Sequence, residues 1–230
     1  MCIRDRTNNL FKQAMIGLQY VLTQKGAMTM AASLGTAFLK TDARLETPDI
    51  QFHIQPFSAD DPAEGAHKFS AFTASVLQLR PESAGHLELV SPNAEVPPEI
   101  HPNYLATQTD CETLVEGIRI ARRIAEHKPV ADLVTSEFRP GPGVSDDFDE
   151  ILTWARDTSV TIYHPTGTCK MGVDDMAVVD PRLRVKGVDG LRVADASIMP
   201  VITSGNTNAP AIMIGEKASD MILEDAKVAA

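Results

Sequence analysis

The sequence predicts an α+β fold in which an antiparallel sheet is flanked by helices. In the first half, several segments alternate apolar and polar residues with the period of a strand. Three later segments carry apolar residues with the period of a helix. Because groups of strands alternate with helices along the chain, an α+β fold is favoured over a purely parallel sheet.

Length and charge limit the classes of protein. The 230 residues suggest one large or two small domains, and an apolar content of 43% is ample for a core. The formal net charge of -10 argues against nucleic acids and anionic membrane surfaces, because both repel an acidic protein. No apolar run approaches the roughly 18 residues of a membrane span. We therefore expect neither nucleic acid as a partner nor a transmembrane segment.

The N-terminus and the cysteines bear on the compartment. Residues 1–6 do not fit the segment after them and lack the apolar region of a secretory signal, so we predict that they are a non-native scar. Cys2, Cys111 and Cys169 are too few for a disulfide framework, which suits a reducing compartment. A cytoplasmic protein, free or peripheral to a membrane, is expected. The absence of a Cys-x-x-Cys pair predicts no metal site.

The N-terminal part is predicted to contain a helix and a strand. Apolar residues over 10–23 recur at spacings of three and four, which predicts a helix that Gly26 ends. Residues 27–38 show no clear period and suit either a strand or a close-packed loop. Residues 50–55 alternate apolar and polar side chains, which predicts a half-buried strand.

Two further strands are expected to pair. Residues 69–79 form a long stretch that predicts a strand buried on much of both faces. Leu87 and Leu89 alternate with polar neighbours, which predicts another strand. Residues 80–85 would turn the chain between the two, so an antiparallel pair is expected. Residues 91–104 hold four prolines and predict an ordered loop.

Two helices are predicted in the middle of the chain. Thr109 begins a capping box, and the helix that follows is closed by Pro129. Ser145 is predicted to cap a second helix that runs to about Arg156, with aspartates at its positive end. The stripe expected to be buried on the first helix consists of Leu114, Ile118, Ala121 and Ala125.

The C-terminal part is predicted to hold a strand pair and a final helix. Apolar residues over 178–185 and 191–193 suggest two strands, and the glycine-flanked residues 187–190 suggest the turn between them. The apolar stripe over 209–223 predicts the last helix.

Two polar clusters stand out, one around His164 and one around Asn206. His164 lies between a stiff Pro165 step and a Gly-rich bend. About forty residues later, Asn206 and Asn208 stand where the final helix is expected to begin. An imidazole with an ordinary pKa of about 6.5 can exchange protons near neutral pH, and a helix start stabilises negative charge. We expect the clusters to be two halves of one polar site; on the residues alone, a structural histidine and a helix-capping asparagine are the alternatives.

Two other residues are candidates for chemistry. Asp195 directly follows an expected strand, where acids often bind ligands, although a turn-forming role is equally consistent. Cys169 lies five residues after His164, so a Cys–His nucleophile is a weaker alternative.

Several of these segments resemble the C-terminal half of glucose-methanol-choline (GMC) oxidoreductases, in the choline-dehydrogenase-like branch. The motifs that carry the resemblance lie at residues 163–172, 179–185, 187–200 and 206–217, and residues 79–86 and 102–105 resemble the family's substrate domain. The resemblance implies FAD as cofactor and an alcohol as substrate. It implies that His164 takes the hydroxyl proton while the alcohol carbon gives hydride to flavin N5, and that Asn206 lies beside the substrate oxygen. The cofactor contacts that it implies are Asp195, Ala196, Thr207 and Asn208.

The chain departs from the family pattern in one large respect. It contains no Gly-x-Gly-x-x-Gly, the motif with which the family binds the ADP part of FAD. The resemblance therefore implies that residues 7–160 are mainly the substrate domain, that residues 161–230 close the FAD-binding α/β domain, and that the N-terminal Rossmann half is missing. That half would be the main partner, and the isolated chain is expected to be inactive. The alternatives are a non-catalytic interaction module derived from this fold and a hydrolase that uses Cys169 and His164.

Overall fold

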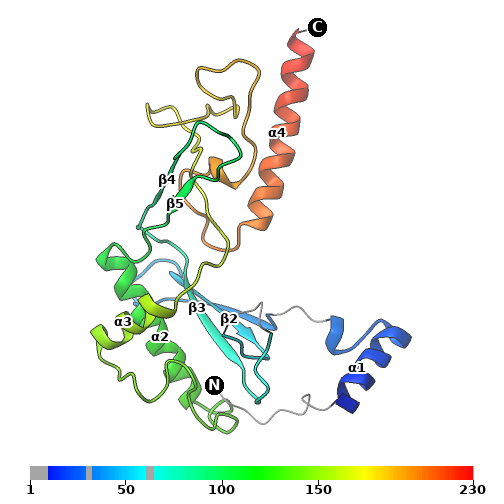
Figure 1. Ribbon diagram of the computed structural model, residues 1–230, viewed down its shortest axis with the longest axis vertical. Helices are drawn as coiled ribbons and strands as arrows, with labels where there is room; N and C mark the ends of the chain where they lie inside the picture. Colours follow the sequence, from blue (N-terminus) through cyan, green and yellow to red (C-terminus); the bar gives the residue numbers. More distant parts are fainter. Residues whose placement is uncertain (1–9, 30–32, 61–64, 230) are drawn as a thin grey trace. The chain divides into compact units, whose positions relative to one another are not determined.

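The computed structural model describes residues 10–29, 33–60 and 65–229, and these fall into two units (Figure 1). The first unit takes its described residues from 1–78 and 107–159, and the second from 79–106 and 160–230. The predicted α+β class is confirmed, because antiparallel strands and helices make up the fold. The scar predicted at residues 1–6, and Cys2 within it, lie outside the described residues.

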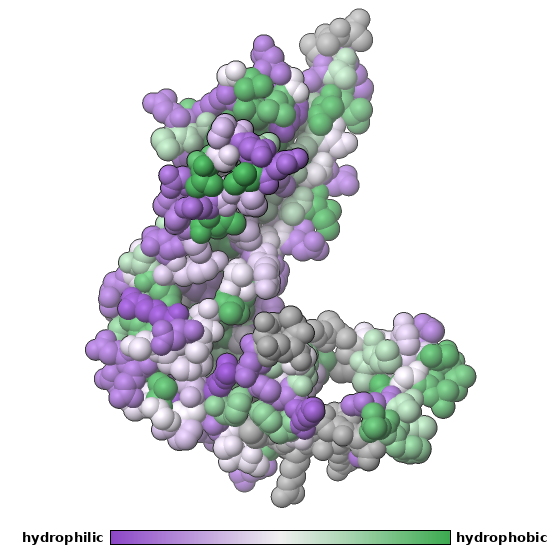
Figure 2. Space-filling view, in the orientation of Figure 1, coloured by the Kyte–Doolittle hydropathy of each residue, from purple (hydrophilic) through white to green (hydrophobic). Residues whose placement is uncertain are grey.

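The first helix of the first unit is as predicted but lacks cover. Helix α1 spans Leu10–Thr23 and is followed by a 3-10 turn, η1, at Ala27–Thr29. Gly26, between them, has a φ of +99°, a value that favours glycine. No residue of α1 is buried, and Leu10 and Phe11 are 85% and 73% exposed. Figure 2 shows the apolar side chains that gather on this helix.

A three-stranded antiparallel sheet forms the centre of the first unit. Strands β1 (Gly35–Leu39), β2 (Ile50–Gln55) and β3 (Thr73–Gln78) lie in the order β1-β2-β3. Ile50 and Phe52 are fully buried, as their alternation predicts. Gln51 is also only 1% exposed, so the prediction of a half-buried strand is wrong here. Its amide nitrogen lies 2.8 Å from His53 Nε2, and this hydrogen bond offsets part of the cost of burying the amide.

The expected hairpin between residues 69–79 and 86–90 is not formed. Strand β3 pairs with β2, whereas β4 (His86–Glu88) pairs with β5 (Glu99–His101) in a separate two-stranded ribbon. Strand β5 lies within the stretch predicted to be a loop. A Cβ on Gly85 would lie 2.0 Å from the carbonyl oxygen of His101, so the absence of a side chain at Gly85 permits this pairing.

Helix α2 (Gln108–Glu126) packs on the sheet. It begins earlier than predicted, because Thr107 takes an extended conformation and its Oγ1 accepts a hydrogen bond from the Asp110 amide at 3.3 Å. Of the predicted stripe only Ile118 is buried. A Cβ on Gly117 would lie 2.6 Å from Val76 Cγ2, which shows how closely α2 approaches β3.

Helix α3 (Phe148–Thr158) begins two residues later than predicted. Its N-cap is Asp147, whose side chain accepts from the amides of Asp149 and Glu150 at 2.9 and 3.2 Å. Ser145, the predicted cap, instead donates its own amide to Glu150 Oε2 at 2.8 Å. An aspartate closer to the first helical turn therefore replaces the serine as the cap.

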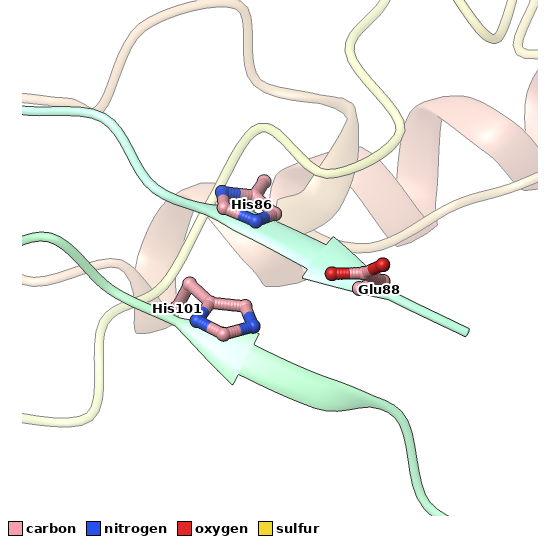
Figure 3. A group of neighbouring side chains, drawn as sticks. All are labelled: His86, Glu88 and His101. Carbon is pink, nitrogen blue, oxygen red and sulfur yellow. The ribbon is translucent and has the colours of Figure 1, made fainter. Parts of the chain in front are cut away.

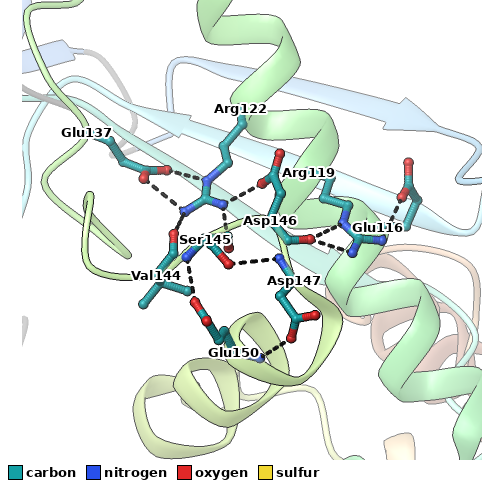
Figure 4. A network of polar contacts seen from close by, with 9 residues as sticks. All are labelled: Glu116, Arg119, Arg122, Glu137, Val144, Ser145, Asp146, Asp147 and Glu150. Atoms are coloured by element: carbon teal, nitrogen blue, oxygen red, sulfur yellow. Dashed lines mark hydrogen bonds and ion pairs between the residues drawn. The ribbon is translucent and has the colours of Figure 1, made fainter.

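Arg122 of α2 holds the loop that leads into α3 (Figure 4). Its guanidinium donates to Glu137 at 3.0 and 3.1 Å and to Asp146 at 2.5 Å. It also donates to the carbonyl oxygens of Val144 and Ser145 at 2.8 and 3.0 Å. The hydrogen bonds with Glu137 raise the pKa of Arg122 above its ordinary value, and the one with Asp146 raises it further by a smaller amount. One side chain thus fixes the acidic segment before α3.

The second unit is built around the last helix. Helix α4 spans Asn208–Ala229 and is longer at both ends than the predicted 209–223. Its inner face, Ile214 and Ala218, packs in one core with Val179, Leu183 and the short helix η2 (Ala196–Ile198). The predicted strand pair is present only as backbone bonds and isolated bridges, such as Val185 N to Leu191 O at 2.9 Å. No described helix combines the length and apolar composition needed to cross a membrane.

Candidate active site

The segment that carries His164 is pinned to the core of the second unit. After Gly167, whose φ is +86°, the amides of Cys169 and Met171 donate to the carbonyl oxygens of Ser197 and Ile198 at 3.0 and 2.8 Å. Residues 196–199 form η2 and its cap, and Ile198 is buried in the same core as Ile214 of α4. The loop after His164 is therefore fixed, through η2, to the helix that follows Asn206.

His164 contacts the second polar cluster with both ring nitrogens. Its Nε2 lies 2.9 Å from Asn206 Nδ2, and its Nδ1 lies 2.9 Å from Thr207 Oγ1. These residues are 42 and 43 positions away in the sequence. The two clusters predicted from the sequence thus meet at one place.

The hydrogen-bond partners of His164 determine which of its ring nitrogens carries the proton. The amide nitrogen of Asn206 can only donate, so His164 Nε2 must accept and carry a lone pair. In the neutral ring the proton then resides on Nδ1 and is donated to Thr207 Oγ1. Thr207 is only 7% exposed, whereas Asn206 is exposed. The basic nitrogen therefore lies on the open side of the cluster and the anchored nitrogen on the buried side.

The start of α4 lies directly beside this pair. The Ala211 amide donates to the Thr207 carbonyl at 2.9 Å, so the first turn of the helix closes on Thr207. The amides of a first turn have no carbonyl partners inside the helix, and the helix start carries about half a positive charge. The side chain of Asn206 contacts His164, so the alternative in which Asn206 only caps the helix does not account for this contact. A donor-rich, positively polarised end thus adjoins His164.

Asp195 and Ala196 make different contacts from those that join His164, Asn206 and Thr207. Asp195 caps η2, and its Oδ1 accepts from the Ser197 amide at 2.7 Å. Hydrogen bonds from the Ser197 side chain, and then from its backbone, lower the pKa of Asp195. The turn-forming interpretation is therefore confirmed, while a contact with FAD stays a prediction. Within the described part of the chain, no hydrogen bond joins Asp195, Ala196 or Asn208 to His164.

Arg80 is a further residue of this region that the sequence motifs did not single out. Its Nε donates to Ser204 Oγ at 3.0 Å and so holds the loop just before Asn206. The only available signal was its place in the segment 79–86, which the resemblance assigned to the substrate domain. Thr207 was expected near the flavin, but its hydrogen bond to the imidazole was not foreseen.

The Cys–His alternative lacks the contact that it requires. A cysteine nucleophile needs a histidine within hydrogen-bond reach, yet the ring nitrogens of His164 bond to Asn206 and Thr207. The amide of Cys169 bonds to Ser197, and its side chain is half-buried. The arrangement disfavours a hydrolase that uses this pair. A hollow of about 520 Å³ is lined by residues of α3 and the preceding loop, not by this cluster.

Comparisons with known proteins relate this arrangement to oxidoreductases. The family model described as GMC oxidoreductase matches residues 81–215, more than half of the chain. An alcohol dehydrogenase (acceptor) of Pseudomonas putida is 39% identical over 218 residues, which cover 94% of this chain and 39% of that protein. An oxygen-dependent choline dehydrogenase of Brucella ovis is 42% identical over 217 residues, with the same coverage of 94% and 39%.

A solved structure agrees with this relationship. A formate oxidase variant from Aspergillus oryzae RIB40, studied for the effect of the mutation on FAD modification, has a TM-score of 0.84 and 27% identity. The match covers 94% of this chain and 42% of that chain. The fold that holds the cluster of His164, Asn206 and Thr207 is thus similar to that of a solved oxidase. The chain belongs to the GMC oxidoreductase family, and the resemblance found in the sequence is confirmed.

The chain spans 39% of the length of the curated relatives named above. FAD is the cofactor of this family, as expected. The residues around His164 suit a flavin, because an exposed carboxamide and a helix start offer donors to a ring that becomes negatively charged on reduction. Thr207 and Asn208, two of the predicted flavin contacts, lie at this helix start, and their contact with FAD stays a prediction.

Proposed function

We propose that this chain supplies the proton-accepting site of a longer FAD-dependent alcohol oxidoreductase. The observation that carries the proposal is the pair of hydrogen bonds that joins His164 to Asn206, from which it accepts, and to Thr207, to which it donates, in a member of the GMC family. When bound, FAD would supply the redox chemistry by accepting a hydride from the alcohol carbon.

His164 acts as the general base in this proposal. Its Nε2 lone pair accepts the proton of the substrate hydroxyl, and Nδ1 keeps its hydrogen bond to Thr207 throughout. The Thr207 hydroxyl thus stabilises the imidazolium that forms and fixes the orientation of the ring. Because Thr207 is buried and directly precedes α4, the ring cannot turn without breaking a contact inside the fold.

Asn206 is the second residue that would touch the substrate. In the free site its amide nitrogen occupies the Nε2 lone pair of His164. An alcohol oxygen that binds between them would accept from Asn206 Nδ2 and donate to His164 Nε2, so both groups keep a partner. As the proton leaves, negative charge grows on the oxygen, and the amide and the start of α4 stabilise it.

The proposal also explains the uncovered helix. Two apolar residues of α1, Leu10 and Phe11, are largely exposed in this chain, which spans 39% of its relatives. We infer that the missing FAD-binding half covers α1. Hydrogen exchange over residues 10–23 should be slower in the full-length gene product than in this chain alone, and equal exchange rates would contradict the inference.

The substitution His164→Ala in the full-length gene product tests the assigned base. Flavin reduction by an alcohol in stopped-flow measurements should slow by about 10²–10⁴-fold, the usual contribution of general base catalysis. The flavin absorption of the purified variant should be retained, because His164 is not the main holder of the cofactor. A variant that binds FAD and is reduced at the parental rate would refute the role of His164.

A further inference from the structure

The β4–β5 ribbon places four side chains of ligand type on one face. In its register His86 lies opposite His101, and Glu88 lies opposite Glu99. Side chains two residues apart on a strand point to the same face, and directly opposed residues share a face as well. The ribbon therefore gathers two imidazoles and two carboxylates on one side.

The side chains on this face already converge. One ligand atom from each of His86, Glu88 and His101 can be chosen so that all three lie within 4.8 Å of one another (Figure 3). The two imidazole rings stack at a centroid distance of 4.6 Å, with 16° between their planes. Glu99 Oε2 lies 3.5 Å from His101 Nε2, so the fourth group borders the same cluster.

The backbone enforces this convergence. A Cβ on Gly85 would collide with the carbonyl oxygens of His101 and Pro102, at 2.0 and 2.7 Å. The glycine therefore lets the strand that carries His86 approach the one that carries His101. The two histidines are 15 positions apart in the sequence, so no short spacing motif could have indicated a metal site. The sequence-based expectation of no metal was drawn from such motifs alone.

We propose that His86, Glu88 and His101 form a binding site for a first-row transition-metal ion, with Zn²⁺ as the representative. Imidazole nitrogens suit zinc, copper and nickel, whereas calcium and magnesium prefer oxygen ligands. Ligands around a tetrahedral zinc ion, at about 2.0–2.1 Å from it, lie about 3.4 Å apart. The lone pairs of an imidazole lie in the plane of its ring, so the stacked rings of His86 and His101 must rotate before both can face one ion. The side chain of His101 is 45% exposed, which leaves room for this rotation.

The bound ion would stabilise the β4–β5 ribbon. Each strand has only three residues, and an isolated two-stranded ribbon is marginal on its own. An ion held by both strands would cross-link them through side chains. Because the ligands lie outside the contacts of His164, this site is separate from the proposed proton-accepting site.

Calorimetric titration of the full-length gene product with ZnCl₂, in chelator-free buffer, tests the proposal. One ion should bind per chain, and His86→Ala and His101→Ala should each weaken binding by about tenfold or more. Glu88→Gln should weaken it less. Two controls, His127→Ala at the C-cap of α2 and Cys169→Ser, should bind as the parent does, because neither residue belongs to the ribbon.

Three results would contradict the proposed metal site. Absence of binding by the parent would overturn the proposal. Parental affinity in the His86→Ala/His101→Ala double variant, or loss of affinity in Cys169→Ser, would place the ion elsewhere and also overturn it. Circular dichroism of each variant, matched to the parent, separates loss of ligands from loss of fold.

Discussion

At His164, the two ring nitrogens have different partners and different surroundings. Nδ1 faces the buried Thr207 hydroxyl, and Nε2 faces the exposed Asn206 amide. Such an arrangement fixes the tautomer of a histidine without a carboxylate partner.

Thr207 is therefore expected to position the base. Thr207→Val keeps the shape of the side chain but removes the acceptor for His164 Nδ1. We expect kcat for alcohol oxidation to fall by about tenfold, and the pH profile of kcat to shift because the imidazolium loses its hydrogen bond. Thr207→Ser, which keeps the hydroxyl, should restore both. A valine variant with parental kcat and pH profile would show that this hydrogen bond has no part in the reaction.

At the scale of elements, packing between α2 and β3 limits which side chains fit. A Cβ on Gly117 would lie 2.6 Å from the branched Val76 side chain. Gly117→Ala should gain about 0.5–1 kcal/mol from helix propensity and lose about 1–3 kcal/mol from overpacking. We expect a net loss of about 1 kcal/mol, measured as a lower midpoint of chemical denaturation.

A matched variant in another helix provides the control. A Cβ on Gly215 of α4 meets nothing within 4 Å, so Gly215→Ala should leave stability unchanged or raise it. Adding Val76→Ala to Gly117→Ala should relieve part of the loss. If Gly117→Ala and Gly215→Ala behaved alike, the close approach of α2 to β3 would be contradicted.

The end of α4 is tied to the loop before η2 by charge. Asp225 accepts from Arg182 at 2.7 Å and also bonds to Arg192, and these hydrogen bonds, first that of Arg192, lower its pKa below the ordinary 3.8. A lowered pKa in the folded state means that the carboxylate stabilises the fold above pH 3.8. That stabilisation is lost as the pH falls through the lowered value.

Asp225→Asn should therefore lower the melting temperature near neutral pH. The difference from the parent should shrink as the pH falls below 3.8, because the parent loses the same charge. Asp220→Asn, which removes only an exposed 3.6 Å contact with Lys217 on the same helix, should have little effect. A difference that stayed constant from neutral to acidic pH would contradict the role assigned to the Asp225 charge.

The elements also show what sequence patterns can and cannot predict. Periodicity located α1, β2 and α4, because each carries its own apolar pattern. It misassigned the partner of residues 86–90, since strand pairing depends on long-range contacts such as the approach of Gly85 to His101. The start of α3 was placed two residues early because Ser145 and Asp147 are both good caps.

At the scale of the whole molecule, the candidate site was partly predictable. The residue types around His164 and Asn206 suggested one polar site, and the structure places their side chains in contact. The hydrogen bond from His164 Nδ1 to Thr207 and the anchoring of Ser204 by Arg80 were not predictable, because they depend on how the loops before α4 fold. The domain roles assigned to residues 7–160 and 161–230 stay predictions, since residues 79–106 pack in the same unit as 160–230.

A double-mutant cycle on flavin reduction tests the central claim most directly. In the full-length gene product, stopped-flow rates would be compared for the parent, His164→Ala, Asn206→Ala and the double variant. If both residues act on one alcohol oxygen, Asn206→Ala alone should cost less than His164→Ala, and should add little once His164 is gone. Losses that simply multiply, or an Asn206→Ala variant reduced at the parental rate, would contradict a shared site.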